Sequence, residues 1–243
     1  MIAISINGLT KKYKERIAVD DLSLDINEGE LFALLGFNGA GKTTTIKLLT
    51  GLLKPTSGDA HIFKKSIVNE INDIKPILNI SPQESAVAPN LSVFENLVLI
   101  AEIYGFKKEE AIKKAYQMME KFGITDRKND KAKKLSGGLK RRLSIAMALI
   151  TDPKIVFLDE PTLGLDVRAR RELWHIISEL KGKTTIILTT HYLEEVEALA
   201  DSIAIIDKGK LKIKGTIEEL KTSTQKDKLE DIFISLTEGD ATL

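Results

Sequence analysis

The sequence predicts an α/β protein with a mainly parallel sheet, an N-terminal antiparallel β-subdomain and an inserted α-helical subdomain. Three observations predict this architecture. A glycine-rich loop lies between a strand-like and a helix-like segment within residues 31–49, and short β-branched runs alternate with helical patterns beyond residue 150. Between these regions, residues 84–134 have helical spacing. Strands that alternate with helices are typical of a parallel sheet covered on both faces.

The N-terminal region is expected to form a small β layer. Isoleucine or leucine recurs at every second position, at 2, 4 and 6 and again at 22, 24 and 26. Such alternation predicts half-buried antiparallel strands. The continuous apolar run Leu31–Leu35 then predicts a fully buried strand.

The loop that follows this strand has the composition of a phosphate-binding loop. Glycines let successive backbone N–H groups converge on an anion, and the next helix adds the positive end of its dipole. The Lys42 ammonium can reach the β- and γ-phosphates of a nucleotide, and the Thr43 hydroxyl can bind Mg²⁺. The expected contacts are Gly36, Asn38, Gly39, Ala40, Gly41, Lys42, Thr43 and Thr44.

The middle and the end of the chain supply the other elements. Ser92 and Glu95 have the spacing of a capping box, which opens the helical subdomain. Beyond it, β-branched runs predict the strands 155–158, 185–188 and 203–206. The polar segment 222–228 is expected to be a linker before a C-terminal helix whose apolar stripe is Leu229, Ile232, Phe233 and Leu236.

Two carboxylates come directly after the strand predicted at 155–158. Open α/β sheets bind their ligands at the carboxyl ends of the strands, so Asp159 and Glu160 are placed for chemistry. Asp159 suits Mg²⁺, directly or through water, and Glu160 can orient and deprotonate an attacking water. The alternative is that this pair only starts a turn.

A second helix start has the properties of an anion site. Ser136 can cap the helix that follows, and Gly137 and Gly138 leave the backbone N–H groups unhindered. Because one nucleotide does not need two such sites, the second is expected to bind the nucleotide of another protomer in a head-to-tail dimer. The alternative is an ordinary serine-capped helix.

Composition narrows the class of function. The chain has 243 residues, no cysteine, and a formal charge of +1 from 36 basic and 35 acidic residues. The absence of cysteine excludes disulfides and thiolate catalysis, and the balanced charge gives no support to nucleic-acid binding. No run of apolar residues is long enough to cross a bilayer and no signal peptide is evident, so a cytoplasmic location is expected.

Taken together, these motifs resemble the ATP-binding cassette (ABC) ATPase family over about residues 2–215, which implies a P-loop NTPase core that binds ATP and Mg²⁺. The resemblance implies an ATPase domain over residues 1–220, with the helical subdomain at about 84–135, followed by a linker and C-terminal helix over 221–243. It identifies residues 36–44 as Walker A, Ser136-Gly137-Gly138 as the signature motif and Asp159-Glu160 as Walker B.

The resemblance also implies roles for residues that local chemistry alone does not single out. Gln83 is expected to contact Mg²⁺ or the attacking water and to report the nucleotide state to a partner. His191 would bind the γ-phosphate and hold Glu160, and Asp166 belongs to the D-loop. Tyr13 occupies the position of the ring that stacks on adenine, although a tyrosine between two lysines can equally pack on a surface strand.

One position departs from the family pattern. Leu139 replaces the usual glutamine after the two signature glycines. A leucine side chain cannot donate a hydrogen bond across a nucleotide, so this residue predicts weaker ATP-induced dimerisation.

The family reading implies the nucleotide-binding subunit of a transporter. Two cassettes, as a homodimer or a paired cassette, would close around two ATP molecules and power a separate transmembrane permease from the inner face of the cell membrane. The C-terminal stripe resembles that of drug and sodium exporters, although a helix that only packs on its own domain would have the same stripe. A soluble mechanical ABC ATPase is the alternative, and a P-loop kinase or GTPase would leave the signature motif and His191 without a role.

Overall fold

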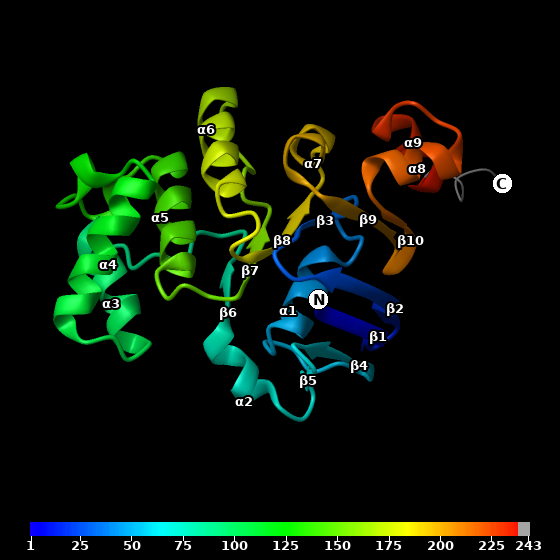
Figure 1. The fold of residues 1–243 in the computed structure, drawn as a ribbon, viewed down its shortest axis with the longest axis horizontal. Coiled ribbons are helices and arrows are strands. Elements are labelled where there is room, and N and C mark those ends of the chain that lie inside the picture. Colours follow the sequence, from blue (N-terminus) through cyan, green and yellow to red (C-terminus); the bar gives the residue numbers. More distant parts are fainter. Residues whose placement is uncertain (238–243) are drawn as a thin grey trace. The chain divides into compact units, whose positions relative to one another are not determined.

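The computed structural model describes residues 1–237, and the chain divides into two compact units. The first unit contains residues 1–75 together with the chain from residue 181 onward, and the second contains residues 76–180. Figure 1 shows the elements of both in sequence colours. The predicted helical subdomain lies inside the second unit, which also contains two strands.

The first unit contains an antiparallel sheet of the strands β1 (Ile2–Tyr13), β2 (Arg16–Asn27), β4 (Ser57–Ile62) and β5 (Lys65–Ser66). In the β1–β2 ribbon, Ile4 lies opposite Ile26 and Ile6 lies opposite Leu24. All four side chains are buried. The alternation in the sequence therefore predicts this ribbon correctly, because one face of the ribbon packs on the core.

In the first unit, a second sheet contains the strands β3 (Leu31–Leu35), β8 (Thr185–Thr190), β9 (Ser202–Asp207) and β10 (Lys210–Gly215). β3 pairs in parallel with both β8 and β9, and all five of its residues are buried. It is therefore a central strand. β10 pairs antiparallel with β9 and carries exposed lysines at positions 210, 212 and 214, which oppose pairing with another chain.

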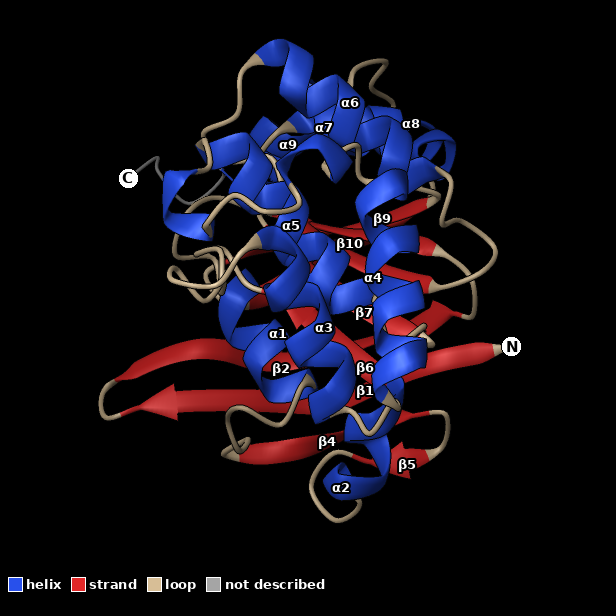
Figure 2. Cartoon of the chain, turned by 90° about the vertical axis from the view of Figure 1, so that its left-hand side faces the viewer, coloured by secondary structure: helices blue, strands red, loops and turns tan. Residues whose placement is uncertain are grey.

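This unit also contains the helices α1 (Lys42–Leu49), α2 (Ile71–Ile74) and α7 (Leu193–Leu199). Figure 2 distinguishes helices from strands by colour. α1 begins directly after the glycine-rich loop, and its residues Ile46, Leu48 and Leu49 are buried. The loop is thus fixed between a buried strand and a helix packed on the core.

The C-terminal helices α8 (Ile217–Thr224) and α9 (Leu229–Thr237) pack on the same unit. Leu229, Ile232 and Phe233 are buried in a cluster with residues of β3 and β9, and Leu236 packs against that cluster. The apolar stripe predicted for the C-terminal helix is therefore confirmed, and this stripe belongs to the core of the first unit.

The segment predicted as a linker is in part helical. α8 extends through Thr224 and so includes the first three residues of that segment. The Thr222 and Thr224 hydroxyls donate to the carbonyls of Glu218 and Leu220 at 2.8 and 2.7 Å. Because each polar side chain bonds four residues back, polarity alone does not end this helix.

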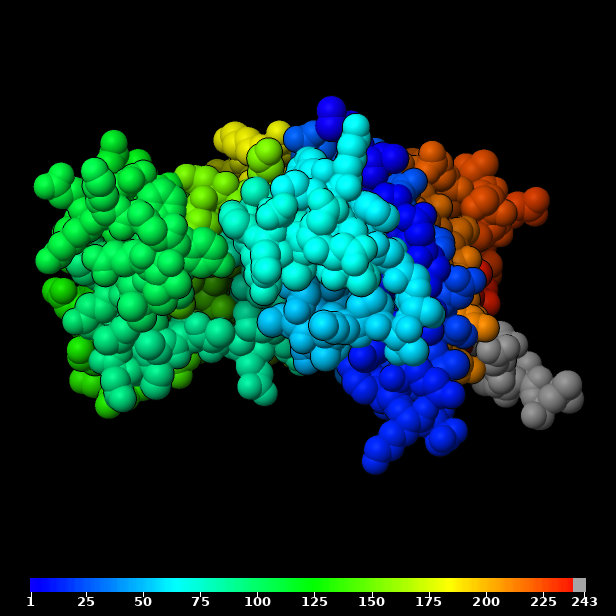
Figure 3. Space-filling model, turned by 90° about the horizontal axis from the view of Figure 1, so that it is seen from below, coloured from blue at the N-terminus to red at the C-terminus, as the bar shows by residue number. Residues whose placement is uncertain are grey.

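The second unit contains β6 (Leu78–Ser81), α3 (Val93–Ile103), α4 (Lys108–Lys121), α5 (Gly137–Leu149), β7 (Ile155–Asp159) and α6 (Val167–Ser178). β6 and β7 pair in parallel. α3 begins at the predicted capping box, in which Ser92 and Glu95 each bind the other's backbone N–H. Short 3₁₀ turns at Thr125–Arg127 and Ala132–Lys134 connect α4 to α5. Residues of α3 and α4 form the green surface in Figure 3.

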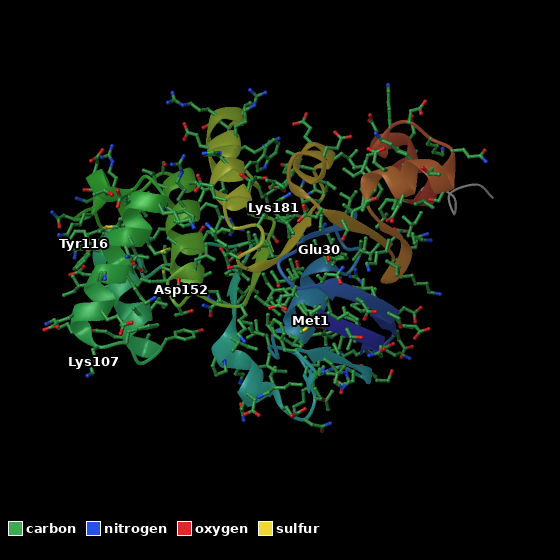
Figure 4. The ribbon with its side chains drawn as sticks, viewed as in Figure 1. Met1, Glu30, Lys107, Tyr116, Asp152 and Lys181 are labelled. Atoms are coloured by element: carbon green, nitrogen blue, oxygen red, sulfur yellow. The ribbon has the colours of Figure 1, made fainter. Side chains whose placement is uncertain are left out.

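α4 packs mainly as its apolar spacing predicts. Met119 and Phe122 are buried, but Tyr116 is 44% exposed and is labelled in Figure 4. Its ring contacts Phe94, and its hydroxyl accepts a hydrogen bond from Lys128 Nζ. A tyrosine at the border of an apolar stripe thus keeps its polar end at the surface.

No helix within residues 1–237 has both the length and the apolar character needed to cross a membrane.

Candidate active site

The glycine-rich loop between β3 and α1 has a backbone that other residues would not adopt easily. Gly39 and Gly41 have φ of 86° and 110°, a region that favours glycine. A Cβ at Gly41 would lie 2.4 Å from the Ala18 carbonyl oxygen, and one at Gly36 would lie 2.5 Å from that of Ile206. The loop therefore needs glycine both for its curl and for its close approach to neighbouring backbone.

Lys42 begins α1 and points back into this loop. It is 5% exposed, and its Nζ donates to the carbonyl oxygens of Gly36 at 2.7 Å and Phe37 at 3.3 Å. The first turn of α1 contains no acidic residue. A buried ammonium, a helix N-terminus and a glycine cradle together form a site for phosphate. Thr43 and Thr44 follow in the same first turn.

A backbone hydrogen bond joins the residue before His191 to the glycine-rich loop. His191 follows β8, whose last residue Thr190 accepts a hydrogen bond from the Gly36 N–H at 3.4 Å. The imidazole ring packs on Tyr192, with 4.2 Å between ring centroids. The strand end that carries His191 is therefore bonded to the first residue of the phosphate loop.

Tyr13 ends β1 and is 44% exposed. Lys11 Nζ lies 5.3 Å from the centroid of its ring. Arg16 pairs with Tyr13 across the β1–β2 hairpin. A guanidinium nitrogen of Arg16 lies 3.5 Å from the position that a Cβ on Gly39 would occupy. Arg16 is a cation beside the phosphate loop that the sequence analysis missed; the signal was its position in the hairpin next to Tyr13.

In the second unit, the ends of two parallel strands carry the other polar residues. Ser81 pairs with Leu158, so Gln83 and Glu160 each lie two residues beyond a paired position at the same edge. Gln83 is exposed, whereas Asp159 is 2% and Glu160 is 5% exposed. The carboxyl ends of parallel strands are where α/β sheets bind ligands.

Glu160 has an unusual backbone. Its φ is 48°, in the left-handed region that residues other than glycine seldom adopt. Such a conformation costs on the order of 1–3 kcal/mol and persists only where the surroundings impose it. Because Glu160 combines this backbone with burial and a position at a strand end, it is a candidate for a functional role.

The buried side chain of Arg141, on α5, joins the two strand ends. Its guanidinium donates to the carbonyl oxygens of Asp159 at 2.6 Å and Pro161 at 2.9 Å. It also donates to the carbonyl oxygens of Pro82 and, at 3.4 Å, Gln83. The sequence analysis missed Arg141, because a run of basic residues at a helix start gives no sign of burial.

The signature residues form a capped helix start with open space in front of it. The Ser136 hydroxyl accepts a hydrogen bond from the Leu139 N–H at 3.3 Å, so the predicted cap is confirmed. A Cβ on Gly137 would meet nothing within 4 Å, and one on Gly138 would make only ordinary contacts. The fold therefore does not need glycine at these two positions.

Asp166 is the N-cap of α6. Its side chain accepts a hydrogen bond from the Ala169 N–H at 2.8 Å. This bond is a sufficient local reason for an aspartate at the position. A contact with nucleotide stays a prediction.

The donor set suits magnesium bound with phosphate. Within residues 1–237 there is no group of three or more acidic or histidine side chains that could hold a metal by itself. Mg²⁺ bound with nucleotide needs only one or two protein carboxylates or hydroxyls, because phosphates and waters complete its shell. Asp159 carries a carboxylate and Thr43 a hydroxyl of this kind.

The site residues therefore lie in two groups. The first unit carries Tyr13, Gly36, Asn38, Gly39, Ala40, Gly41, Lys42, Thr43, Thr44 and His191, and the second carries Gln83, Ser136, Gly137, Gly138, Asp159, Glu160 and Asp166. A phosphate cradle after a buried strand, together with an acidic pair at the end of another strand, defines the class of P-loop nucleoside triphosphatases.

Comparisons with known proteins narrow this class. The profile of the family described as ABC transporter matches residues 19–163, more than half of the chain. The chain is 40% identical to the daunorubicin/doxorubicin resistance ATP-binding protein DrrA of Streptomyces peucetius, over 91% of this chain and 67% of that protein. It is 41% identical to the human phospholipid-transporting ATPase ABCA3, over 90% of this chain but only 13% of that protein.

Solved structures of ABC transporter cassettes are similar to this chain in fold. The ATP-binding subunit of an ABC transporter has 28% identity and a TM-score of 0.87, with 96% of this chain and 99% of that chain covered. The dimeric structure of MJ0796, a bacterial ABC transporter cassette, has 25% identity and a TM-score of 0.82, covering 88% and 98%. The chain belongs to the ABC transporter family, and it is an ATP-binding cassette that hydrolyses ATP.

Proposed function

We propose that this cassette powers a separate membrane subunit of an exporter. The observation that carries the proposal is an exposed apolar surface on the helical subdomain, which ATP hydrolysis by itself does not require. The likeness to a drug-resistance ATP-binding protein supports export as the direction of transport.

This surface, here called the α3 face, consists of Leu99, Ile103 and Tyr104. Their exposed fractions are 40%, 66% and 44%. Leu99 and Ile103 are four residues apart on one side of α3, whereas Val93 and Leu97 of the same helix are buried. Neighbouring exposed apolar side chains mark protein interaction sites, and a membrane subunit offers the apolar partner that they require.

Hydrolysis is assigned to the following residues. Lys42 and the loop amides bind the β- and γ-phosphates, and Glu160 orients and deprotonates the attacking water. Gln83 contacts the metal or this water. His191 binds the γ-phosphate, and Tyr13 stacks on the adenine. Glu160 is suited to its role because phosphoryl transfer depends on positioning, and its strand-end backbone is held firmly.

Mg²⁺ is assigned to Thr43, Asp159 and Gln83. When bound, the ion neutralises charge that develops on the phosphate oxygens. Thr43 offers a hydroxyl beside Lys42, and Asp159 offers a carboxylate beside Glu160.

Dimerisation is assigned to the signature residues and Asp166. The empty space in front of Gly137 leaves room for a phosphate of an ATP molecule held by a second cassette. The dimeric structure of the related cassette supports this arrangement. The second cassette is another copy of this chain or a paired homologue.

The test is affinity purification of the native chain from detergent-solubilised membranes, followed by mass spectrometry. If the cassette is bound to a membrane subunit on the inner face of the cell membrane, a polytopic membrane protein should be recovered with it in stoichiometric amount. A soluble partner, or none, would instead favour a mechanical ATPase.

A pair of variants makes this test specific. Ile103→Glu is expected to lower recovery of the membrane protein while the isolated cassette keeps its ATPase activity. Val68→Glu is the matched control, because Val68 is 50% exposed but lies in the first unit. Equal recovery with the two variants would contradict the assignment of the α3 face.

A further inference from the structure

Arg141 is a buried cation whose hydrogen bonds surround the proposed general base. It is 4% exposed, although it lies in a basic run of three residues at the start of α5. Its Nη2 donates to the Asp159 carbonyl at 2.6 Å and its Nε donates to the Pro161 carbonyl at 2.9 Å. The guanidinium therefore binds the chain immediately before and immediately after Glu160.

The same guanidinium binds the segment that carries Gln83. Its Nη1 donates to the Pro82 carbonyl and, at 3.4 Å, to the Gln83 carbonyl. A guanidinium presents five N–H groups in a rigid fork, so it can hold two separate segments at once. A lysine ammonium in its place is a point donor and cannot reproduce this geometry.

α5 is itself bonded to β6 along one side. The Ser144 and Ser81 hydroxyl oxygens are 3.0 Å apart, and Asn79 Nδ2 donates to the Ala148 carbonyl at 2.8 Å. Positions 141, 144 and 148 share one face of a helix. Arg141 is thus the end, at the candidate active site, of a polar seam between the signature helix and β6.

The strained backbone of Glu160 explains why such a clamp is needed. A left-handed φ of 48° at a residue other than glycine persists only where neighbouring bonds impose it. The bonds from Arg141 to Asp159 and Pro161 hold the chain on both sides of that residue.

We propose that Arg141 is a positioning residue for ATP hydrolysis: it holds the Glu160 carboxylate and the Gln83 backbone in register with the signature helix. The proposal rests on the roles assigned above to Glu160 and Gln83. The hydrogen bonds of Arg141 described above go to the segments that carry Glu160 and Gln83, so its loss should lower turnover far more than nucleotide binding.

The first experiment compares Arg141→Met with Asn79→Ala, well below the unfolding temperature of each variant. Asn79 is the matched control, because it is a buried member of the same seam whose hydrogen-bond partners Ala148, Thr151 and Tyr104 lie outside both site segments. For Arg141→Met, kcat is expected to fall by about tenfold or more with KM and the ATP Kd within roughly threefold. For Asn79→Ala, only thermal stability should fall.

If Arg141→Met does not fold, Arg141→Lys provides the same comparison, because it keeps the charge but loses the fork, and kcat should again fall without a change in KM. Equal losses of kcat in the Asn79 and Arg141 variants would overturn the proposal, as would wild-type kcat in a folded Arg141 variant.

Chemical rescue supplies the second readout. Millimolar guanidinium ion should restore part of the turnover of Arg141→Ala and none of any loss in Asn79→Ala, and absence of rescue in folded Arg141→Ala would contradict the clamp. Glu160→Gln, measured in parallel, separates two failures. Retained turnover in Glu160→Gln would show that Glu160 is not the general base. Lost turnover in Glu160→Gln, together with wild-type kcat in Arg141→Met, would refute only the proposed role of Arg141.

Discussion

Phe37 of the phosphate loop packs against Phe233 of the C-terminal helix α9, with ring centroids 4.7 Å apart and ring planes inclined by 58°. Phe233 is buried, whereas Phe37 is 47% exposed. The Phe37 carbonyl also accepts a hydrogen bond from Lys42 Nζ. The C-terminal helix is therefore in direct contact with the glycine-rich loop to which Lys42 is bonded.

This contact predicts energetic coupling between the loop and α9. Replacing both rings, Phe37→Leu with Phe233→Leu, should destabilise the protein by less than the sum of the single changes. The expected coupling is about 0.5–1.5 kcal/mol in the free energy of unfolding, as for other aromatic pairs. Urea unfolding of the two single variants and the double variant measures it.

A second set of two single variants and their double variant controls for a general loss of packing around α9. Leu229→Val changes a buried residue of the same helix whose side chain has no aromatic ring. Its effect should add to that of Phe37→Leu. Additivity in both sets of variants would show that the ring contact carries no coupling.

Lys42→Ala should weaken ATP binding by roughly tenfold or more, because a charge-assisted hydrogen bond is lost from a buried site. Isothermal titration calorimetry with ATP measures the change in the dissociation constant. Lys47→Ala is the control, since Lys47 lies exposed in the last turn of the same helix. Similar ATP affinities for the two variants would refute the phosphate role of Lys42.

Removal of Mg²⁺ by EDTA should abolish turnover, because the ion neutralises charge that develops on the phosphate. Asp159→Asn should raise the Mg²⁺ concentration needed for half-maximal turnover, since it removes a carboxylate ligand. Steady-state phosphate release at a series of Mg²⁺ concentrations tests both statements. An unchanged Mg²⁺ requirement in Asp159→Asn would exclude Asp159 as a ligand.

Much of the fold was predictable from local pattern. Alternation predicted the β1–β2 ribbon, and the continuous apolar run predicted β3 as a buried strand. The spacing of glycines with Lys42 predicted the phosphate loop, because that loop is a local structure whose backbone and charge lie in consecutive residues. Ser92 and Ser136 were predicted as caps for the same reason.

What the sequence did not predict depends on contacts between distant segments. Arg141 donates hydrogen bonds to the carbonyls of Pro161 and Pro82, which lie about 20 and 60 residues away in the chain. Backbone acceptors have no side-chain signature, so nothing in the sequence marks them. The contact of Phe37 with Phe233 likewise joins opposite ends of the chain. The helical end of α8 was missed because its residues are polar and lack apolar periodicity, while the Thr222 and Thr224 hydroxyls bond to carbonyls one turn back.

Leu139→Gln should increase ATP-induced dimerisation. A glutamine at this position can donate a hydrogen bond to an opposing nucleotide, whereas the leucine can contribute only its backbone N–H, and Ser136 already binds that group. Light scattering in the presence of ATP measures the dimer fraction. Equal fractions for the wild type and the variant would show that position 139 does not limit dimerisation.

Glu160→Gln tests the catalytic assignment most directly. The amide cannot take a proton from water, so turnover should fall by about 100-fold or more, while ATP still binds through the phosphate loop. Single-turnover ATP hydrolysis, with the oligomeric state followed by light scattering, is the measurement to make. Loss of hydrolysis together with accumulation of an ATP-bound dimer is the predicted result, and wild-type turnover in Glu160→Gln would contradict the assignment of Glu160 as the general base.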